Sequence, residues 1–313
     1  MRVRVKGSFS QNTAMRTANI ALVSRSAAAG AIGAWLQTQR ISRYDPMAAA
    51  AIGKASVQCV ATCAQGGPAR RCRQAMAAAL VIGGVDMPHA KVSPTSRALE
   101  DQTYPDKWPF DARDLTPQDP SDDQLFYLIP KFVQHAGSEC RECLTKYYGC
   151  VLPDDGDVLD LCSSWTSHYP KGYKAKRCAA LGLNALELLA NPSKTEWTVQ
   201  NLNKDPTLPY DDNSFDVVTN SLSADYLTSP LGVFEEVRRV LKPGGLAAMA
   251  FTNRCFPTKV VPAWTRPFTE PAHARILASY FHYAGFDDVD IAVADVSPDG
   301  FVGQRDPMVV VQA

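Results

Sequence analysis

Apolar residues from Asp157 onward fall into short runs that alternate with longer amphipathic stretches. The short runs are bounded by turn-forming residues, a pattern typical of buried strands. They cover residues 158–161, 177–181, 196–200, 215–219, 246–251, 288–293 and 308–311. Helical spacing is clearest in residues 231–241, and helices are also predicted for residues 183–189 and 272–284. Strands that alternate with helices predict a mostly parallel sheet with both faces covered.

The segment that precedes this pattern is rich in Pro and Asp. Residues 91–124 are therefore predicted to form an extended strap, in which Trp108 and Phe110 are the anchoring side chains. A helix is predicted for residues 138–148, with Gly149 as its C-cap. We expect this helix to lead into the first strand of the α/β domain.

Composition separates the first ninety residues from the rest of the chain. Residues 1–90 hold eleven Lys and Arg against two acids, Asp45 and Asp86, whereas the remainder holds 21 basic and 30 acidic residues, a formal charge of −9. A basic, acid-poor segment without apolar periodicity is typical of an organelle transit peptide. A basic arm that binds nucleic acid is the alternative, and the acidic body argues against it. The predicted organisation is a leader (1–90), a strap and linker (91–137) and an α/β domain (138–313).

A second signal is predicted inside the leader. Arg70 and Arg71 precede the short apolar run Ala75–Val85, and the small residue Ala90 follows it. A twin arginine, about ten apolar residues and a small residue at a cleavage site are typical of a Tat-type export signal. A run this short does not span a bilayer, which takes about twenty residues. The chloroplast is therefore the expected location, with the thylakoid lumen as a narrower hypothesis and the end of a long transit peptide as the alternative.

Five stretches of the chain carry a resemblance to known families. Val158–Asp160, Leu208–Asp216 and Val233–Gly245 resemble class I S-adenosylmethionine-dependent methyltransferases, in detail the ubiquinone/menaquinone-biosynthesis-like group called type 11. Asp160–Pro170 and Ser279–Gly285 are similar to a methyltransferase-like family of plants, algae and bacteria that has no settled substrate. Together they cover roughly residues 124–313.

The resemblance implies a Rossmann-like sheet of seven strands, mostly parallel, preceded by the strap and by helices. It also implies S-adenosylmethionine as the cofactor, bound at the carboxyl ends of the strands where the strand order reverses. The cofactor-binding positions that the family's motifs assign are Asp160, Cys162, Ser164, Asn184, Asn201, Leu202 and Asn220.

Several of these positions depart from the family's pattern. The family has glycines two, four and six residues after the first acid, because the methionine part of the cofactor lies against bare backbone. Cys162, Ser164 and Thr166 stand there instead. Asn184 replaces the acid that binds the ribose, and Asn201 replaces the acid that meets the adenine amino group. Neutral amides lack the charge assistance of a carboxylate, so we expect cofactor affinity to be lower by about one to three decades.

Methyl transfer needs alignment and a dry site, and it needs a base only if the acceptor must lose a proton. The candidate catalytic residues are Asp225 and Tyr226 at the end of the fourth strand, and His168 after the first strand. Arg254, after the fifth strand, and His282, on the late helix, are the candidates for binding the acceptor. A structural or surface role is the alternative for both histidines and for the arginine.

Other chemistries have weaker support. The fourth strand is not followed by an Asn/Asp-Pro-Pro-aromatic segment, which argues against amino methylation of nucleic acid bases. Six of the nine cysteines lie in the body, with no spacing that indicates a disulfide framework. Cys140 and Cys143 could form a metal or redox pair, but two cysteines on one helix face are the preferred interpretation, so no metal site is predicted. No stretch of the body predicts stable membrane insertion.

Three functions stay open at this point. The first is an active methyltransferase acting on a small-molecule O- or C-nucleophile, which the retained Asp160 and the complete sheet pattern favour. The second is a methyltransferase fold with weak or no activity that serves as a binding or assembly factor in the plastid, which the missing glycines favour. The third is a methyltransferase that modifies a protein partner.

Overall fold

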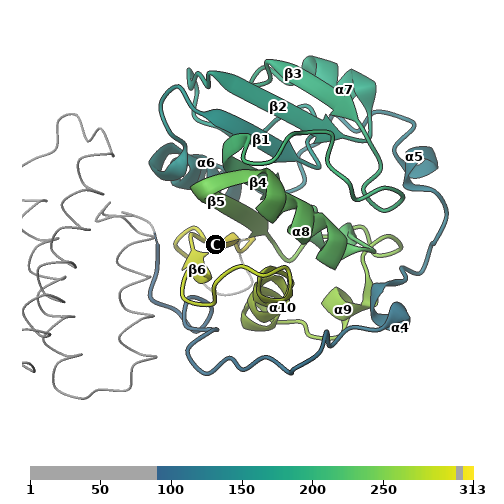
Figure 1. Cartoon of the computed structure of the whole chain (residues 1–313), viewed down its shortest axis with the longest axis vertical. Coiled ribbons are helices and arrows are strands. Elements are labelled where there is room, and N and C mark those ends of the chain that lie inside the picture. The colour runs from purple at the N-terminus through teal and green to yellow at the C-terminus, as the bar shows by residue number, and fades with distance from the viewer. Residues whose placement is uncertain (1–89, 301–305) are drawn as a thin grey trace, which may run out of the picture. The chain divides into compact units, whose positions relative to one another are not determined.

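The computed structural model describes residues 90–300 and 306–313 (Figure 1). The expected leader and its second signal, apart from Ala90, lie outside the described residues. Within the two described ranges, no helix combines the length and the apolarity that crossing a bilayer requires.

Seven strands form one sheet in the order β3-β2-β1-β4-β5-β7-β6. Neighbouring strands are parallel from β3 to β5, while β7 runs antiparallel to both β5 and β6. The predicted Rossmann-like, mostly parallel sheet is therefore confirmed. The strands are β1 (Asp157–Leu161), β2 (Arg177–Gly182), β3 (Glu196–Val199), β4 (Phe215–Ser221), β5 (Leu241–Phe251), β6 (Ala292–Asp295) and β7 (Val309–Gln312).

Alternate residues of the central strands face two separate layers of helices. Leu159 and Val218 pack with α8 (Pro230–Val240) and α10 (Glu270–Tyr283) on one face, and Val158 packs with α6 (Ser138–Val151) on the other. This alternation follows from the two-residue repeat of a strand. The shorter helices are α4 (Ala112–Leu115), α5 (Asp123–Phe126), α7 (Ala185–Ala190), η1 (Ala224–Tyr226) and α9 (Pro262–Thr265).

Two predicted boundaries are wrong. Helix α6 continues through Gly149 to Val151, where Leu152 forms the C-cap. An added Cβ at Gly149 would meet the Pro170 ring at 3.3 Å, so this glycine allows close packing and does not end the helix. The strand predicted for residues 288–293 also begins later than predicted. Residues 287–290 form a turn closed by a 2.9 Å backbone hydrogen bond, and β6 begins only at Ala292.

The predicted helix-breaking sequence Lys242–Gly245 belongs to the start of β5. Lys242 Nζ donates to Asp157 at 2.7 Å and to Asp216 at 2.9 Å, so its ammonium joins the beginnings of β1, β4 and β5. Gly244 has a φ of +78°, a conformation that glycine adopts at little cost. The Lys-Pro-Gly-Gly sequence thus turns the chain from α8 into the sheet and fixes three strands at one edge.

The strap has two parts, which contact different regions of the domain. Trp108 and Phe110 contact the ring of Tyr280 with centroid separations of 5.8 and 5.5 Å, as predicted for anchoring side chains. The strap is not wholly extended, because α4 and α5 interrupt it. Its second part, residues 119–135, lies over the carboxyl ends of the strands and is called the lid below.

Candidate functional site

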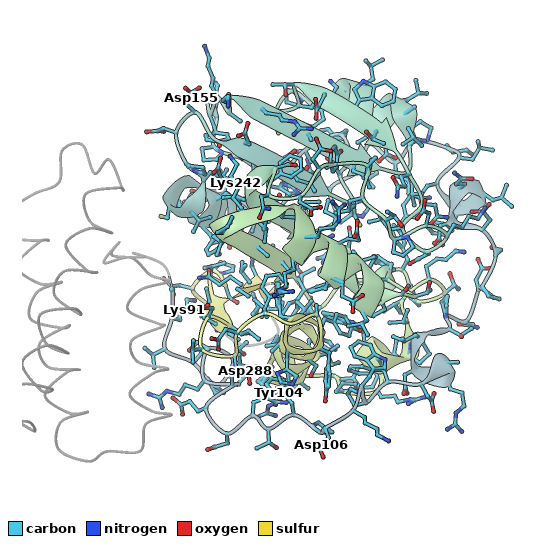
Figure 2. The ribbon with its side chains drawn as sticks, in the orientation of Figure 1. Lys91, Tyr104, Asp106, Asp155, Lys242 and Asp288 are labelled. Atoms are coloured by element: carbon cyan, nitrogen blue, oxygen red, sulfur yellow. The ribbon has the colours of Figure 1, made fainter. Side chains whose placement is uncertain are left out.

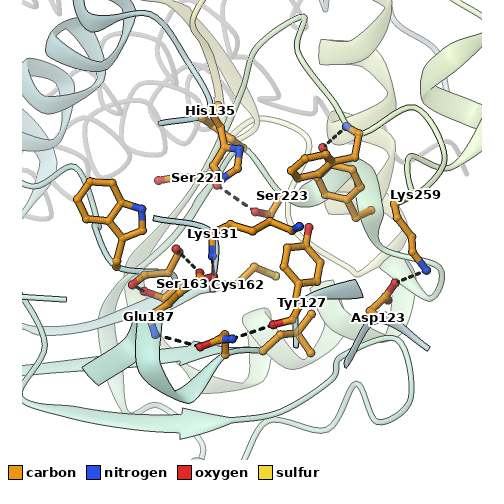
Figure 3. Close-up of a pocket in the computed structure, with 18 of the residues that line it drawn as sticks. Asp123, Tyr127, Lys131, His135, Cys162, Ser163, Glu187, Ser221, Ser223 and Lys259 are labelled. Atoms are coloured by element: carbon orange, nitrogen blue, oxygen red, sulfur yellow. Dashed lines mark hydrogen bonds and ion pairs between the residues drawn. The ribbon is translucent and has the colours of Figure 1, made fainter. Parts of the chain in front are cut away.

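A cavity of about 340 Å³ lies at the carboxyl ends of the parallel strands (Figure 3). Its walls come from the segments that follow β1, β2, β3, β4 and β5, and from the lid. The position spans the boundary between β1 and β4, where the strand order reverses, which is the usual ligand position in an open α/β sheet. Residues on separate strands therefore converge on one space because parallel strands end at the same edge.

Asp160, the last polar residue of β1, is buried beneath the loop that follows it. The hydroxyls of Ser163 and Ser167 donate to its carboxylate at 2.5 and 2.6 Å, and the Asn191 amide donates to Ser167 at 2.8 Å. Burial raises the pKa of Asp160 to about 6, against the lowering effect of these hydrogen bonds. A network of serine hydroxyls and an amide thus fixes the loop that the family builds from glycines.

One residue of this loop has a backbone conformation that favours glycine. Cys162 has a φ of +56°, the left-handed region that a glycine enters most easily, and its side chain lines the cavity. Burial raises the pKa of its thiol to about 12, so the sulfur is a neutral wall atom. Close approach is kept at Gly182, where an added Cβ would lie 2.1 Å from the Ser163 carbonyl oxygen.

Glu187 is a buried carboxylate that the sequence interpretation missed. It lies in the first turn of α7, accepts from the Ser164 hydroxyl at 2.5 Å and accepts from the Lys131 backbone N–H at 2.6 Å. One side chain thereby joins the loop after β1, the helix after β2 and the lid (Figure 3). The resemblance places an acid at position 184, where this chain has Asn184. The acid Glu187 lies three residues further along the chain.

The two asparagines assigned to the adenosine end of the cofactor line the cavity and also bond to the lid. Asn184 caps α7 through its carbonyl oxygen, while its amide donates to the Tyr127 and Leu128 carbonyls at 2.8 and 3.3 Å. The Asn201 amide donates to Asp122 at 3.2 Å. Polar groups that would meet a ribose or an adenine therefore have lid partners in this conformation.

Lys259 holds the beginning of the lid and was not among the predicted site residues. Its side chain is 2% exposed, and its ammonium donates to the Ser121 carbonyl at 2.7 Å and pairs with Asp119 and Asp123 at 3.2 and 3.3 Å. Asp123 also accepts from the Asn203 amide at 2.8 Å. A buried, fully bonded lysine of this kind fixes a loop, because leaving its charge without partners would cost several kcal/mol.

Beyond β4 and β5, the cavity wall is aromatic. Phe256 contacts Phe126, Tyr226 and His135 with ring separations of 5.2, 6.0 and 5.5 Å. Tyr226 accepts a hydrogen bond from the Phe256 N–H at 2.8 Å, and burial raises its pKa well above the usual range. Tyr226 therefore stays protonated at neutral pH and can donate, but cannot serve as a base.

Three more of the predicted site residues line the cavity, namely His168, Arg254 and Leu202. His168 lines the cavity, and burial together with the nearby Arg141 lowers its pKa to about 4. Arg254 lines the cavity as well, with its guanidinium 2.8 Å from Asp306. Among the predicted cofactor residues, Leu202 lies in the wall, next to Asn201.

Three predicted residues do not line the cavity. Asp225 is buried behind Tyr226, and desolvation raises its pKa to about 8. Asn220 is buried in β4, where its amide donates to the Leu161 carbonyl at 3.2 Å. His282 needs the larger correction. His282 lies on α10, where its ring stacks on Tyr104 at 3.9 Å and bonds to Asp288 at 2.5 Å. Figure 2 labels Tyr104 and Asp288. His282 therefore holds the strap and is not an acceptor-binding residue of this cavity.

The cysteines of the body do not form a second site. Cys140 and Cys143 both lie on α6, and Cys140 is buried with its thiol 3.4 Å from the Pro307 carbonyl. No group of three or more metal-binding side chains occurs in the part of the chain that the structure describes.

The residues fit a nucleoside cofactor with a methionine moiety. The left-handed turn at Cys162, the close approach at Gly182 and the buried Asp160 would form the bed for the methionine part. Asn184, Asn201 and Leu202 stand where the ribose and adenine would lie, once the lid exchanges its hydrogen bonds with the two asparagines. When bound, the cofactor would supply an electrophilic methyl group on a sulfonium.

Comparison with known proteins agrees with this geometry. Residues 174–249 match the model of one protein family, which is described as "Methyltransferase domain". No curated protein matches the chain. The S-adenosylmethionine-dependent methyltransferase of Mesorhizobium loti is similar in structure at 15% identity, over 53% of this chain and 94% of its own, with a TM-score of 0.36.

Two further solved structures are similar. The enzyme of the same class from Aquifex aeolicus shares 19% identity over 62% of this chain and 98% of its own, with a TM-score of 0.39. A Haloferax volcanii methyltransferase, solved with the Trm112 activator, shares 19% identity over 55% and 90%, with a TM-score of 0.38. The seven-stranded sheet has the class I methyltransferase fold, residues 174–249 match the methyltransferase domain model, and this match supports S-adenosylmethionine as the cofactor.

Proposed function

We propose that the protein transfers a methyl group from S-adenosylmethionine to an O- or C-nucleophile of a small molecule. The observation that carries this proposal is the cavity itself, which joins the cofactor bed after β1 to an aromatic chamber after β4 and β5. An aromatic chamber of this kind suits a small acceptor, because sites for small molecules are concave and mostly apolar.

Each half of the cavity has a defined task in this proposal. The loop from Asp160 to Ser164 would hold the methionine part, and the ends of β2 and β3 would hold the adenosine. The chain's own contribution to the reaction is alignment and exclusion of water, which suffices for an electrophile as reactive as a sulfonium. The lid excludes water because it covers the strand ends and is bonded to Asn184, Glu187 and Lys259.

Calorimetric titration of the full chain with S-adenosylmethionine and S-adenosylhomocysteine tests the proposal. Micromolar binding of both, weakened by Asp160→Ala, is the expected result. Lys146→Met is a suitable control, because Lys146 lies on α6 in a surface ion pair with Glu142. No heat of binding at millimolar cofactor would rule out the enzyme.

The second candidate is a binding or assembly factor without methyl transfer. The lid bonds of Asn184 and Asn201 favour it, since they occupy groups that the cofactor would need. Modification of a protein partner is a third candidate, and a cavity partly covered by the lid is a poor fit for it. The same titration separates the first two candidates, because only the enzyme has to bind the cofactor.

The plastid stays part of the proposal as the location, with the thylakoid lumen as the narrower hypothesis. Its support is the composition of residues 1–90. Fusion of these residues to a fluorescent protein, followed by import into isolated chloroplasts, is the direct test. Fluorescence that stays outside the organelle would remove the plastid from the proposal.

A further inference from the structure

The aromatic chamber of the cavity holds a cation, Lys131, that has no acidic partner among residues 90–300 and 306–313. Lys131 comes from the lid and lines the cavity, and its ammonium lies 4.4 Å from the centre of the Phe126 ring and 5.7 Å from that of Phe256. Among the described residues, no carboxylate lies within salt-bridge distance of it, whereas the cavity's other cations, Lys259 and Arg254, are paired.

Aromatic rings hold this ammonium without neutralising it. A cation over a ring face gains a modest attraction and keeps its full charge. The Lys131 backbone is fixed at the same time, since its N–H donates to Glu187 at 2.6 Å. Lys131, Tyr127 and His135 project into the chamber in the close-up (Figure 3), so the charge faces the space where an acceptor would lie.

His135 stands beside this cation as an unused imidazole. It is half-buried in the cavity wall, with its ring 5.5 Å from Phe256. The charged groups that act on it are Lys131 of the lid and Glu187 of α7, and burial lowers its pKa below the usual value. His135 is therefore neutral at physiological pH and can accept a proton. His135 contacts Phe256, the same ring that lies beside the Lys131 ammonium, so it is placed at the aromatic end of the cavity where the acceptor would bind.

We propose that the acceptor is a hydroxylated aromatic carboxylate, bound through its carboxylate by Lys131 and deprotonated at its hydroxyl by His135. This inference rests on the proposed methyltransferase function and narrows it to O-methylation. The aromatic wall of Tyr127, Tyr226 and Phe256 suits a planar ring, and one unpaired ammonium suits a single negative charge.

The bonds balance in a single displacement. The hydroxyl oxygen forms a bond to the methyl carbon while the carbon–sulfur bond breaks, and the bond pair stays on sulfur as a neutral thioether. The hydroxyl proton passes to an imidazole nitrogen of His135 and then to solvent. The positive charge of the sulfonium thus leaves the site as that proton.

Binding of protocatechuate and of its methyl ester to the full chain, without cofactor, tests the role of Lys131. The acid should bind about tenfold more tightly than the ester, since one charge-assisted contact distinguishes them. Lys131→Met should bring the ratio close to one, while Lys146→Met, which removes the same charge from the surface of α6, should leave it unchanged. Equal affinities in the wild-type chain, no binding of the acid at millimolar concentration, or a ratio that survives Lys131→Met would each overturn the assignment.

The role of His135 needs a different readout. His135→Gln should keep the binding ratio of acid to ester and lower the rate of methyl transfer by roughly hundredfold or more. A fall in acid binding with an unchanged rate constant would show that the histidine only shapes the chamber. Titration with S-adenosylhomocysteine tests the methyltransferase function separately from the acceptor site at Lys131. A chain that binds the acid through Lys131 but not the cofactor keeps the acceptor site and loses the methyltransferase function.

Discussion

The Glu187 carboxylate accepts the Ser164 hydroxyl at 2.5 Å, and this bond joins the loop after β1 to the helix after β2. Both partners border the cofactor end of the cavity, and the same carboxylate also accepts from the lid backbone. One buried side chain therefore joins three segments, beside the bonds that Asn184 and Asn191 make between them.

Glu187→Ala should lower the free energy of unfolding by about 2–3 kcal/mol, because it removes two hydrogen bonds to a buried charge and leaves a backbone N–H without its acceptor. Denaturant titration measures the change. Glu235→Ala, at an exposed position of α8, is the matched control and should change stability by less than about 0.5 kcal/mol. Equal effects of the two substitutions would show that the three-segment junction contributes nothing.

Asn184→Asp should separate the two tasks of this side chain. An aspartate still caps α7, but it cannot donate to the lid carbonyls of Tyr127 and Leu128, and its charge repels them. We expect faster hydrogen exchange in residues 124–133 and about tenfold tighter binding of S-adenosylhomocysteine, since a carboxylate would meet the ribose hydroxyls. Unchanged exchange and unchanged affinity would mean that Asn184 governs neither the lid nor the cofactor.

Cys162→Gly and Cys162→Ala form a pair that measures backbone strain. Both remove the thiol from the cavity, and only glycine relieves the positive φ of +56°. The glycine variant should therefore be more stable than the alanine variant by about 1 kcal/mol. Thermal or denaturant unfolding of the two proteins checks the difference, and equal stability would contradict the strain.

Asp225→Asn should change how stability depends on pH. The folded state holds the Asp225 proton up to about pH 8, whereas the unfolded chain loses it near the ordinary value of 3.8. The wild-type protein therefore loses stability from this group as pH rises between those two values, at no more than about 1.4 kcal/mol per pH unit. The asparagine variant lacks this loss, so its stability should gain on the wild-type protein as pH rises.

Unfolding titrations at several pH values between 4 and 8 give the comparison. Asp101→Asn, at an exposed position of the strap, is the control and should keep a constant difference from the wild-type protein. A constant difference for Asp225→Asn as well would show that its carboxyl is not buried in solution.

The regular part of the fold could be predicted because its periodicity is strong. The acidic turn before Phe215 and the amphipathic helix after Pro230 lie as predicted, and the first four strands lie close to where the apolar runs predicted them, whereas β5 begins earlier and β6 later. Gly149 shows the limit of such rules. Glycine ends helices often, but here it lies inside one and packs closely on the Pro170 ring, and tertiary packing is not visible in local sequence.

The candidate site could be predicted on the sheet side only. Asp160 lies near the end of β1, and Asn184 and Asn201 follow β2 and β3; these strand ends must meet, so the positions follow from topology. Lys131 and His135 could not be found that way, because they come from a segment whose path over the sheet edge leaves no periodic signal. His282 was misplaced for a related reason, since the sequence does not show that the strap returns to α10 and uses the histidine there.

The lid carries most of its apolar side chains on the outside. Leu125, Leu128, Ile129, Phe132 and Val133 are all exposed, while polar groups make many of the bonds that hold the segment down. Raising the lid would therefore expose new apolar surface mainly where Phe126 and Tyr127 leave Phe256. Heat capacity and denaturant dependence both scale with newly exposed apolar surface, so opening should change each of them only through these aromatic contacts.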